Sequence, residues 1–473
     1  MTDSLRFHWT SPGMVPERHA VYPPEEGDRT QPWSARLWSA VEALPPERLR
    51  AIQLAKLQRA VAFAWERSPF YRRRWEQHGV SPAAIQSLAD VGKLPVVRKE
   101  DFEASQQAQP LFGDVPTAPP DSPTYMKFWS TSGSTGQPRL WLATKEDHEN
   151  DMYLFLRAFY AYGVRPGMRG YFGFAYPPFE AFWKAHYAAE AMGCQVIPKG
   201  PLPTAVILSN LTRWKADFMV CTPTFALRQA EVARQESIDL RAIGIKIIVV
   251  AGEPGGSLPG TKALIEKLWG GARVCDAFGM TEISGPVLFT CDSQAARPAP
   301  LAHMGLDYTL FEIVDPDTLE PVPPGQEGAL IVTSLFRLGM PVIRMFTGDL
   351  VEVTDERCEC GRSFPLVRGG VRGRLDDVIF YKGVKVSPAA AEVAVRAVAG
   401  LGLEYRLEHA GDALTLTAEA LDATDAAAFP ALAAALQQEF TRLTTLRIPA
   451  TIVPAGTLAR AEMKSRRVVR SPE

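Results

Sequence analysis

The sequence predicts an α/β protein with a large N-terminal α/β domain, a small antiparallel β subdomain and a small α+β C-terminal domain. Three observations lead to this fold class. The chain has 473 residues, more than one hydrophobic core usually supports. Short β-branched runs alternate with helix-length segments through its middle, and the composition changes near residue 375. We therefore expect one domain at residues 1–375, which contains the β subdomain at 305–372, and a second domain at 376–473.

The first hundred residues are expected to be largely helical. Apolar side chains between Leu49 and Gly79 recur every three or four residues, as on an amphipathic helix. The pattern breaks at Ser68-Pro69, where we expect one helix to end. Polar and proline-rich residues from about 106 to 123 then predict a loop.

The middle of the chain carries five strand-like runs. They read GYFGFA, CQVIP, FMVCTP, IKIIVVAG and RVCDAFG, and helix-length segments separate them. Such alternation is typical of a mostly parallel sheet with helices on its faces. From 305 to 372 short strands alternate with tight Pro/Gly turns, as in EPVPPGQEGALIVTS, which predicts the antiparallel subdomain.

The C-terminal hundred residues predict a small domain of helices and strands. Ser387-Pro388 has the pattern of an N-cap followed by proline at the first helical position, and an Ala-rich helix should run from there to Gly400. Strands are expected in YRLEHAG and ALTLTAEA, then a helix over about 425–443 and a last strand in ATIVP.

Charge and composition exclude several classes of protein. The formal net charge is −2, so the chain shows no overall attraction to nucleic acid or to an anionic membrane. The N-terminus lacks the apolar core of a signal peptide, and IKIIVVAG is too short to span a bilayer. Six cysteines in so long a chain do not form a disulfide framework. We expect a cytoplasmic protein that is a monomer or homodimer.

The stretch STSGSTGQPR, from Ser130 to Arg139, has the composition of either a flexible surface loop or a phosphate-binding loop. Gln137 follows its last glycine, where a Walker P-loop requires lysine, so that motif is excluded. Glycines can still aim backbone N–H groups at phosphate oxygens, and the hydroxyl groups and Arg139 would add further donors.

Four more motifs follow in order: FGMTE at 278–282, FTGDL at 346–350, GRLDD at 373–377 and LARAEMKSRR at 458–467. With these motifs the chain resembles the acyl-adenylate-forming superfamily, and most of all its phenylacetate–CoA ligase branch. KAHYAAEAMG, AGEP and CECGRSFP are similar to that branch. The resemblance covers roughly residues 45 to 470.

The resemblance implies how this sequence would hold ATP. The Ser/Thr/Gly loop would bind the β- and γ-phosphates, Phe278 would lie against adenine, and Asp349 would accept hydrogen bonds from the ribose hydroxyls with the help of Arg374. The nucleotide-binding residues implied in this way are Ser132, Gly133, Ser134, Thr135, Gly136, Gly252, Glu253, Pro254, Phe278, Gly279, Asp349 and Arg374. The family commonly has lysine where this chain has Arg139.

The catalytic roles also follow from the resemblance. Thr281 would lie near the α-phosphate, Glu282 would ligate Mg²⁺, and Lys464 would stabilise charge during adenylation. Asp376 would be the hinge of a mobile C-terminal domain. The alternatives are a carboxylate that complements a helix dipole at Glu282 and a solvated basic tail around Lys464. The family usually has glycine where this chain has Met463.

Aromatic residues concentrate in GYFGFAYPPFEAFWKAHYAAE. They are expected to line the pocket for an aromatic acid, to shape that pocket for another carboxylate, or to pack in the core. His186 matches a family position and is a candidate for catalysis as well as for the acid pocket. The pocket candidates are Tyr171, Phe174, Tyr176, Phe179 and His186.

Some relatives carry a cysteine, a nearby histidine and a C-x-C pair in the order found here at Cys291, His303, Cys358 and Cys360. Three thiolates and an imidazole suit a closed, structural zinc site. The alternative is free buried thiols with a surface histidine.

The resemblance implies an ATP-dependent carboxylic acid–CoA ligase that forms an acyl-adenylate and then a thioester, acting on an aromatic acid such as a phenylacetate or another aryl acid. Its small-molecule partners would be the acid, ATP and coenzyme A, with Mg²⁺ as cofactor. Two alternatives stay open: an adenylation protein that transfers the acyl group to a carrier protein or an amine, and a catalytically silent nucleotide-binding relative.

Overall fold

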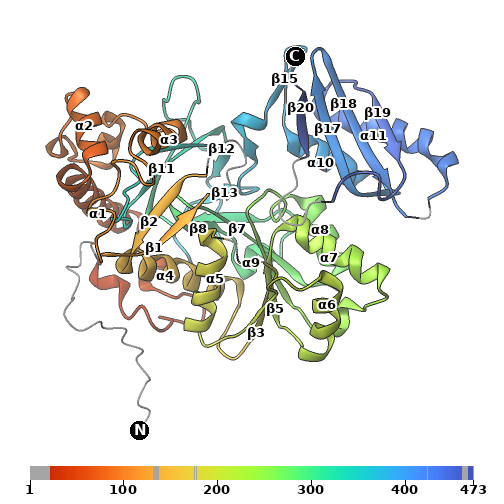
Figure 1. The fold of residues 1–473 in the computed structure, drawn as a ribbon, viewed down its shortest axis with the longest axis horizontal. Helices are drawn as coiled ribbons and strands as arrows, with labels where there is room; N and C mark the ends of the chain where they lie inside the picture. Colours follow the sequence, from red (N-terminus) through yellow and green to blue (C-terminus); the bar gives the residue numbers. More distant parts are fainter. Residues whose placement is uncertain are drawn as a thin grey trace, which may run out of the picture.

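The computed structural model of the chain describes residues 22–131, 138–174, 176, 178–422, 424–460 and 467–471. Two bodies are visible in Figure 1, a large N-terminal domain and a small C-terminal domain. Their α-helices are α1 (Pro46–Arg67), α2 (Pro69–Gln77), α3 (Lys99–Ala108), α4 (Lys145–Tyr162), α5 (Glu180–Ala191), α6 (Thr204–Trp214), α7 (Pro223–Gln235), α8 (Pro259–Leu268), α9 (Asp292–Ala295), α10 (Pro388–Ala397) and α11 (Phe429–Thr444).

A long mixed sheet forms the centre of the large domain. Its strand order is β10-β11-β12-β13-β9-β8-β7-β6-β5-β3-β4, with β14 paired to β12. The strands are β3 (Arg169–Phe172), β4 (Gln195–Pro198), β5 (Phe218–Cys221), β6 (Ile247–Ala251), β7 (Arg273–Met280), β8 (Ser284–Phe289), β9 (Leu301–Met304), β10 (Thr309–Val314), β11 (Glu327–Ser334), β12 (Met345–Thr354), β13 (Leu366–Arg368) and β14 (Gly373–Arg374).

The five runs predicted as strands form β3 to β7, which pair in parallel, as expected for strands joined by helices. In Figure 1, α4 and α5 lie to one side of these strands and α6 to α8 lie to the other. Strands β10 to β14 pair antiparallel, as predicted for 305–372, but they continue the same sheet. The parallel and antiparallel strands therefore form one continuous sheet.

The helical N-terminal segment matches the sequence pattern. Ser68 ends α1 and precedes α2, where the Ser68-Pro69 break was predicted. A two-stranded hairpin of β1 (Tyr125–Ser130) and β2 (Leu140–Thr144) stands apart from the central sheet. Residues 132–137, which join these two strands in the sequence, lie outside the described residues.

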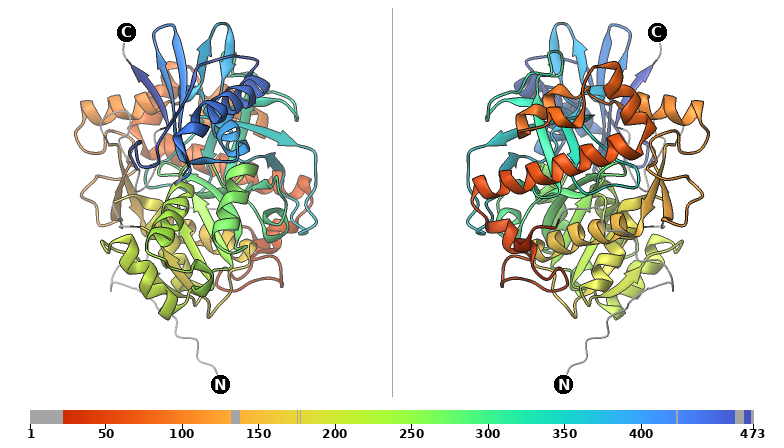
Figure 2. Two further views of the ribbon diagram at one scale, coloured as in Figure 1. Left: turned by 90° about the vertical axis from the view of Figure 1, so that its right-hand side faces the viewer. Right: turned by 90° about the vertical axis from the view of Figure 1, so that its left-hand side faces the viewer.

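The C-terminal domain has its own sheet, ordered β19-β18-β17-β20, and its own hydrophobic core. Figure 2 shows it at the end of the molecule opposite α6. The Ser387 side chain caps α10 as predicted, by accepting from the backbone N–H of Ala389. Its strands are β15 (Ile379–Tyr381), β16 (Val384–Val386), β17 (Leu401–Ala410), β18 (Ala413–Ala420), β19 (Ala450–Val453) and β20 (Val468–Ser471).

Two details of the C-terminal domain differ from the sequence interpretation. The second helix, α11, begins after a short 3-10 turn over Ala426–Ala428. Strand β20 was not predicted; it pairs in parallel with β17 and completes the sheet. Among the described helices, none is both long and apolar enough to cross a membrane.

Candidate functional site

The β1–β2 hairpin brings the two ends of the Ser/Thr/Gly loop together. The N–H of Thr131 donates to the Arg139 carbonyl at 2.9 Å, and the N–H of Arg139 donates to the Thr131 hydroxyl at 3.0 Å. The loop candidates themselves lie outside the described residues, and their roles stay predictions; they are Ser132, Gly133, Ser134, Thr135 and Gly136.

Arg139, at the start of β2, joins this hairpin to the FGMTE motif. Its guanidinium donates to Glu282 at 2.9 Å and to Glu103 of α3 at 2.5 Å. The Glu282 side chain is buried, so an unpaired carboxylate there would be costly and the arginine compensates it. Arg139, which stands where the family commonly has lysine, therefore orients the expected magnesium ligand.

FGMTE spans the end of β7 and the turn into β8. A side chain at Gly279 would meet the Ser284 carbonyl at 2.6 Å, so the close approach of the two strands requires glycine. Arg337, which is fully buried, donates to the Thr281 carbonyl and so holds the turn. Phe278 packs at the edge of a core cluster.

Asp349 and Arg374 lie opposite each other on paired strands β12 and β14. Arg374 donates to the Asp349 carboxylate at 3.2 Å and to Asp376 at 3.0 Å. Burial raises the pKa of Asp349 to about 6, although Arg374 opposes the rise, and the charge of Glu282 adds to it. The predicted ribose-binding pair is thus assembled, within electrostatic reach of the predicted magnesium ligand.

The AGEP segment follows the carboxyl end of β6. Gly252 has a φ of 92°, and the Glu253 carboxylate accepts from the backbone N–H of Thr224 at 2.8 Å. Sequence reasoning missed Asp276, which lies beside this loop on β7 and accepts from the Ser257 hydroxyl at 2.6 Å. Burial raises the pKa of Asp276 to about 6. The sign of Asp276 in the sequence was an acidic residue inside the strand-like run RVCDAFG. Pro254 completes the segment.

The expected acid pocket is an aromatic cluster around the start of α5. The Phe174 and Phe182 rings stack at 3.6 Å, and Tyr176 meets Trp183 edge-on at 4.8 Å. The Tyr176 hydroxyl lies 2.8 Å from Nδ1 of His186.

The His186 ring is also paired on its other side, where Nε2 lies 3.1 Å from Glu190. Phe179 precedes α5, whereas Tyr171 is fully buried on β3. The structure therefore brings Tyr176 and His186 into direct contact, while Tyr171 packs in the core beneath.

A buried network of charges beneath this cluster was not anticipated. Lys184 pairs with Asp151 of α4 and with Glu180 at 3.3 Å, and Arg337 pairs with Glu180 at 2.6 Å. Burial raises the pKa of Glu180 to about 7, although Arg337 and Lys184 lower it. The i,i+4 spacing of Glu180 and Lys184 on α5 was the sequence signal. The network ties two helices to the Thr281 turn.

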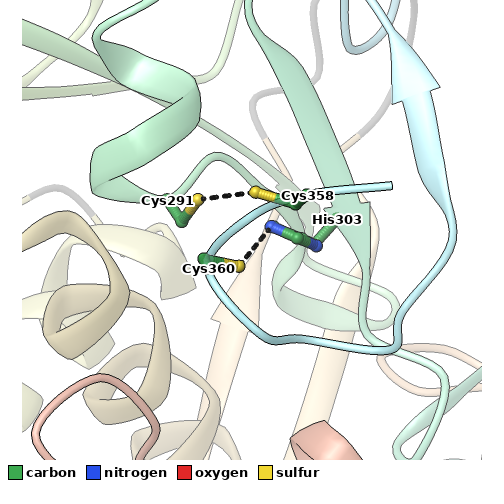
Figure 3. Close-up of side chains that lie close together, drawn as sticks. All are labelled: Cys291, His303, Cys358 and Cys360. Atoms are coloured by element: carbon green, nitrogen blue, oxygen red, sulfur yellow. Dashed lines mark hydrogen bonds between the residues drawn. The ribbon is translucent and has the colours of Figure 1, made fainter. Parts of the chain in front are cut away.

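The four predicted metal ligands meet at one point, although they come from distant parts of the chain. Figure 3 shows Cys291, His303, Cys358 and Cys360 with their donor atoms facing one another, and these atoms all lie within 4.8 Å. The Cys291 and Cys358 sulfurs are 3.5 Å apart, and the Cys360 sulfur is 3.4 Å from Nε2 of His303. His303 is buried, not at the surface as the alternative supposed. The donor set fits a four-coordinate zinc ion.

Lys464 and Met463 lie outside the described residues, so the role of Lys464 stays a prediction. The residues on either side of this segment are not a solvated tail. Arg460 pairs with Glu231 at 3.0 Å and with Glu419 at 2.8 Å, and Arg467 pairs with Glu392 at 3.0 Å.

Several known proteins are similar to this chain. The model of the AMP-binding enzyme family matches residues 42–336. A phenylacetate–coenzyme A ligase from Thermus thermophilus is 32% identical over 78% of this chain and 79% of its own length. The chain therefore belongs to the AMP-binding enzyme family, in the branch of acyl-adenylate-forming enzymes that resembles phenylacetate–CoA ligases.

Two structures of one protein, a 2-hydroxyisobutyryl-CoA ligase, differ in their similarity to this chain. Its postadenylation state with 2-HIB-AMP has a TM-score of 0.87 at 30% identity and 93% coverage of both chains. Its thioesterification state with 2-HIB-AMP and CoA scores 0.70 at the same identity and coverage. Because the protein is the same, the arrangement of its parts accounts for the difference. This chain is arranged like the postadenylation state.

Proposed function

We propose that this chain is an ATP-dependent carboxylic acid–CoA ligase. The observation that carries the proposal is the presence of two arginine–carboxylate pairs within electrostatic reach of each other, Arg139 with Glu282 and Arg374 with Asp349, in a member of the AMP-binding enzyme family. One cation orients a buried carboxylate, and a second carboxylate with its arginine is placed to accept from a cis-diol. Such a site suits a nucleotide whose phosphates and ribose are held separately.

In the first step, a carboxylate oxygen of the acid attacks the α-phosphorus of ATP. A P–O bond forms, the bond to the β-phosphate oxygen breaks, and pyrophosphate leaves with that electron pair. The chain's part is positioning and charge stabilisation. Asp349 and Arg374 would hold the ribose, the loop at 132–136 would hold the leaving phosphates, and Lys464 would stabilise the developing negative charge.

In the second step, the thiolate sulfur of coenzyme A attacks the acyl carbon of the adenylate. The C–S bond forms, the C–O bond to AMP breaks, and AMP leaves as the phosphate anion. The small domain would have to move first, and Asp376 lies between the two cores, where it pairs with Lys99 at 3.1 Å. We assign the hinge to this position.

Glu282 is the residue that would hold Mg²⁺, since a buried carboxylate offers the hard oxygen donor that this ion prefers. The ion would neutralise phosphate charge. For the acid, we propose an aromatic molecule, because the rings of Phe174, Tyr176 and Trp183 gather near His186. The Tyr176–His186 contact would then set the polar end of the pocket.

Exchange of labelled pyrophosphate into ATP tests the proposal. Purified protein should catalyse exchange only when an acceptable acid is added, and a panel of phenylacetate, benzoates, indole acids and 2-hydroxyisobutyrate would identify it. Absence of exchange with the whole panel would favour a silent nucleotide-binding protein. Acyl transfer to a carrier protein or an amine, with none to CoA, would favour the other alternative.

We also propose that the cluster of Cys291, His303, Cys358 and Cys360 binds a structural zinc ion. Four ligands leave no open position for a reactant. Elemental analysis of purified protein should give one zinc per chain, and Cys360→Ser should lose it and unfold at a lower temperature. Cys194→Ser, a change at a buried cysteine outside the cluster, is the matched control for zinc content. Full-length protein without zinc would reject the assignment.

A further inference from the structure

The segment that carries Lys464 is held at both of its described ends. Arg460 precedes it and forms an ion pair with Glu231 of the large domain, and Arg467 follows it and pairs with Glu392, which accepts a hydrogen bond from Thr261 of the large domain. Residues 461–466, between these two anchors, lie outside the described part of the chain. The contacts of Arg460 and Arg467 therefore fix the described residues on either side of this segment.

The first anchor joins α7 of the large domain to β18 of the small domain. Arg460 lies between two carboxylates: its Nη2 is 3.0 Å from Glu231 of α7 and 2.8 Å from Glu419 of β18. Arg228 pairs with the same Glu231 at 2.6 Å. Burial raises the pKa of Glu231, but hydrogen bonds from Arg460 and Arg228 outweigh it and lower the pKa overall. Glu231 is therefore a charged carboxylate on the large domain, available to pair with Arg460.

The second anchor joins α8 to α10. The buried hydroxyl of Thr261 donates to Glu392 at 2.5 Å, and Glu392 also pairs with Arg467 at 3.0 Å. Burial alone would raise the pKa of Glu392, but Arg396 and Arg467 lower it to about 2. Helices α8 and α10 approach closely here: a Cβ atom added at Gly260 of α8 would lie only 2.9 Å from Cβ of Arg396 of α10.

Both anchors cross from one domain to the other, in an arrangement that resembles a postadenylation state more than a thioesterification state. We propose that Glu231 and Thr261 are positioning residues for adenylation, which hold the two flanks of the Lys464 segment against the large domain and release them before thioester formation. This inference rests on the proposed function. It predicts that the two residues influence one half-reaction only.

Glu231→Gln and Thr261→Val test the inference, because each removes the large domain's share of one anchor. Glu231→Gln leaves the Arg460–Glu419 pair of the small domain in place. Thr261→Val removes a hydroxyl without changing the shape of the side chain. The matched control is Glu236→Gln, which removes a charge from the exposed end of the same helix α7.

Two rates are measured for each protein: acid-dependent pyrophosphate exchange, and thioester formation from the synthetic acyl-adenylate and CoA. Exchange should fall about tenfold in each variant, as expected for the loss of one charge-assisted hydrogen bond. Thioester formation should be unchanged or faster, and Glu236→Gln should match wild type in both. Amide hydrogen exchange should rise in α8 and α10 of Thr261→Val.

Equal loss of both rates, or no change in exchange, would overturn the positioning role. That result differs from failure of the proposed function, in which the wild-type protein itself would show no acid-dependent exchange. Each variant should have the same midpoint temperature of thermal unfolding as the wild-type protein, which would show that the measured rates come from folded protein. Glu231 lies on α7 and Thr261 on α8, so the same change in both variants could not come from a local distortion of one helix.

Discussion

Two charged networks flank the active site, and they differ in where their charges lie. The network of Asp151, Glu180, Lys184 and Arg337 belongs entirely to the large domain, and its side chains are at most 1% exposed. The network around Arg460 crosses between domains, and the side chain of Arg460 is 20% exposed. The first network holds the Thr281 turn, and the second holds Arg460, which precedes the segment that carries Lys464; Thr281 and Lys464 are both predicted to take part in catalysis.

The difference shows how burial decides whether a charged contact is permanent or reversible. Separating fully buried charges leaves an uncompensated ion in a medium of low polarity, so such a network is not broken in a catalytic cycle. A partly exposed pair regains water when it opens, and its net contribution is small. The chain therefore has its permanent charged contacts within the large domain and reversible ones between its domains.

The largest effect is expected at Arg337. Arg337→Met removes one of the two cationic partners of Glu180, of which the other is Lys184, and should destabilise the protein by about 3–5 kcal/mol, the range for breaking a buried ion pair. Chemical denaturation measures it. Arg234→Gln, which removes an ion pair whose side chains are 59% and 61% exposed, is the control and should cost less than about 1 kcal/mol.

A double variant sharpens this prediction. Arg337→Met combined with Glu180→Gln leaves no unpaired carboxylate, so it should be more stable than Arg337→Met alone. If the single variant were as stable as wild type, the buried network would not be the permanent contact described above.

The next effect is expected at Lys464, which we propose the interdomain network positions for adenylation. Lys464→Ala should slow pyrophosphate exchange by roughly 10²–10³-fold, as is typical when a transition-state charge contact is lost. Thioester formation from synthetic acyl-adenylate should persist. Comparable loss in both reactions would show that the lysine serves the fixed part of the site rather than one half-reaction.

The smallest effect is a pH dependence at Asp349, a residue of the fixed domain. Its pKa is raised to about 6, so the carboxylate is charged at pH 7.5 and largely protonated at pH 5. Because a charged acceptor binds a hydroxyl more strongly than a neutral one, ATP and AMP affinity should both fall about fivefold over this range. Isothermal titration calorimetry measures both.

Asp349→Asn is the control for this titration because asparagine does not ionise. The variant should bind ATP and AMP more weakly than the wild-type protein, and the fivefold fall between pH 7.5 and 5 should be lost. The two nucleotides should respond equally, because the ribose is bound in both half-reactions. A pH effect on ATP alone would place Asp349 with the reversible contacts instead.

The sequence predicted those features that depend on local pattern. Strands β3 to β7 follow their β-branched runs, and the Ser387 cap follows from one dipeptide. The pairing of Asp349 with Arg374 and the meeting of the four cysteine and histidine ligands also agree with the predicted site, because each rested on an ordered set of motifs. The structural zinc itself and the hinge at Asp376 stay predictions.

Features that depend on a distant partner could not be predicted. Arg460 and Arg467 read as a basic tail, since nothing near them in the sequence shows that Glu231, Glu419 and Glu392 surround them. Lys184 and Arg337 sit among apolar residues, and their partners are defined only once α4, α5 and the Thr281 turn pack together. A charged residue within an apolar stretch was the only sign in the sequence. It does not show whether the side chain is buried or which residue pairs with it.

One quenched-flow measurement tests the central claim most directly. Purified protein is mixed with ATP, Mg²⁺ and the acid that supports pyrophosphate exchange, then CoA is added, and products are identified by mass spectrometry at each stage. Acyl-adenylate should accumulate before CoA is added and should be converted to acyl-CoA and AMP afterwards. An acyl-adenylate that forms but never yields a thioester, or a thioester that forms without AMP, would contradict it.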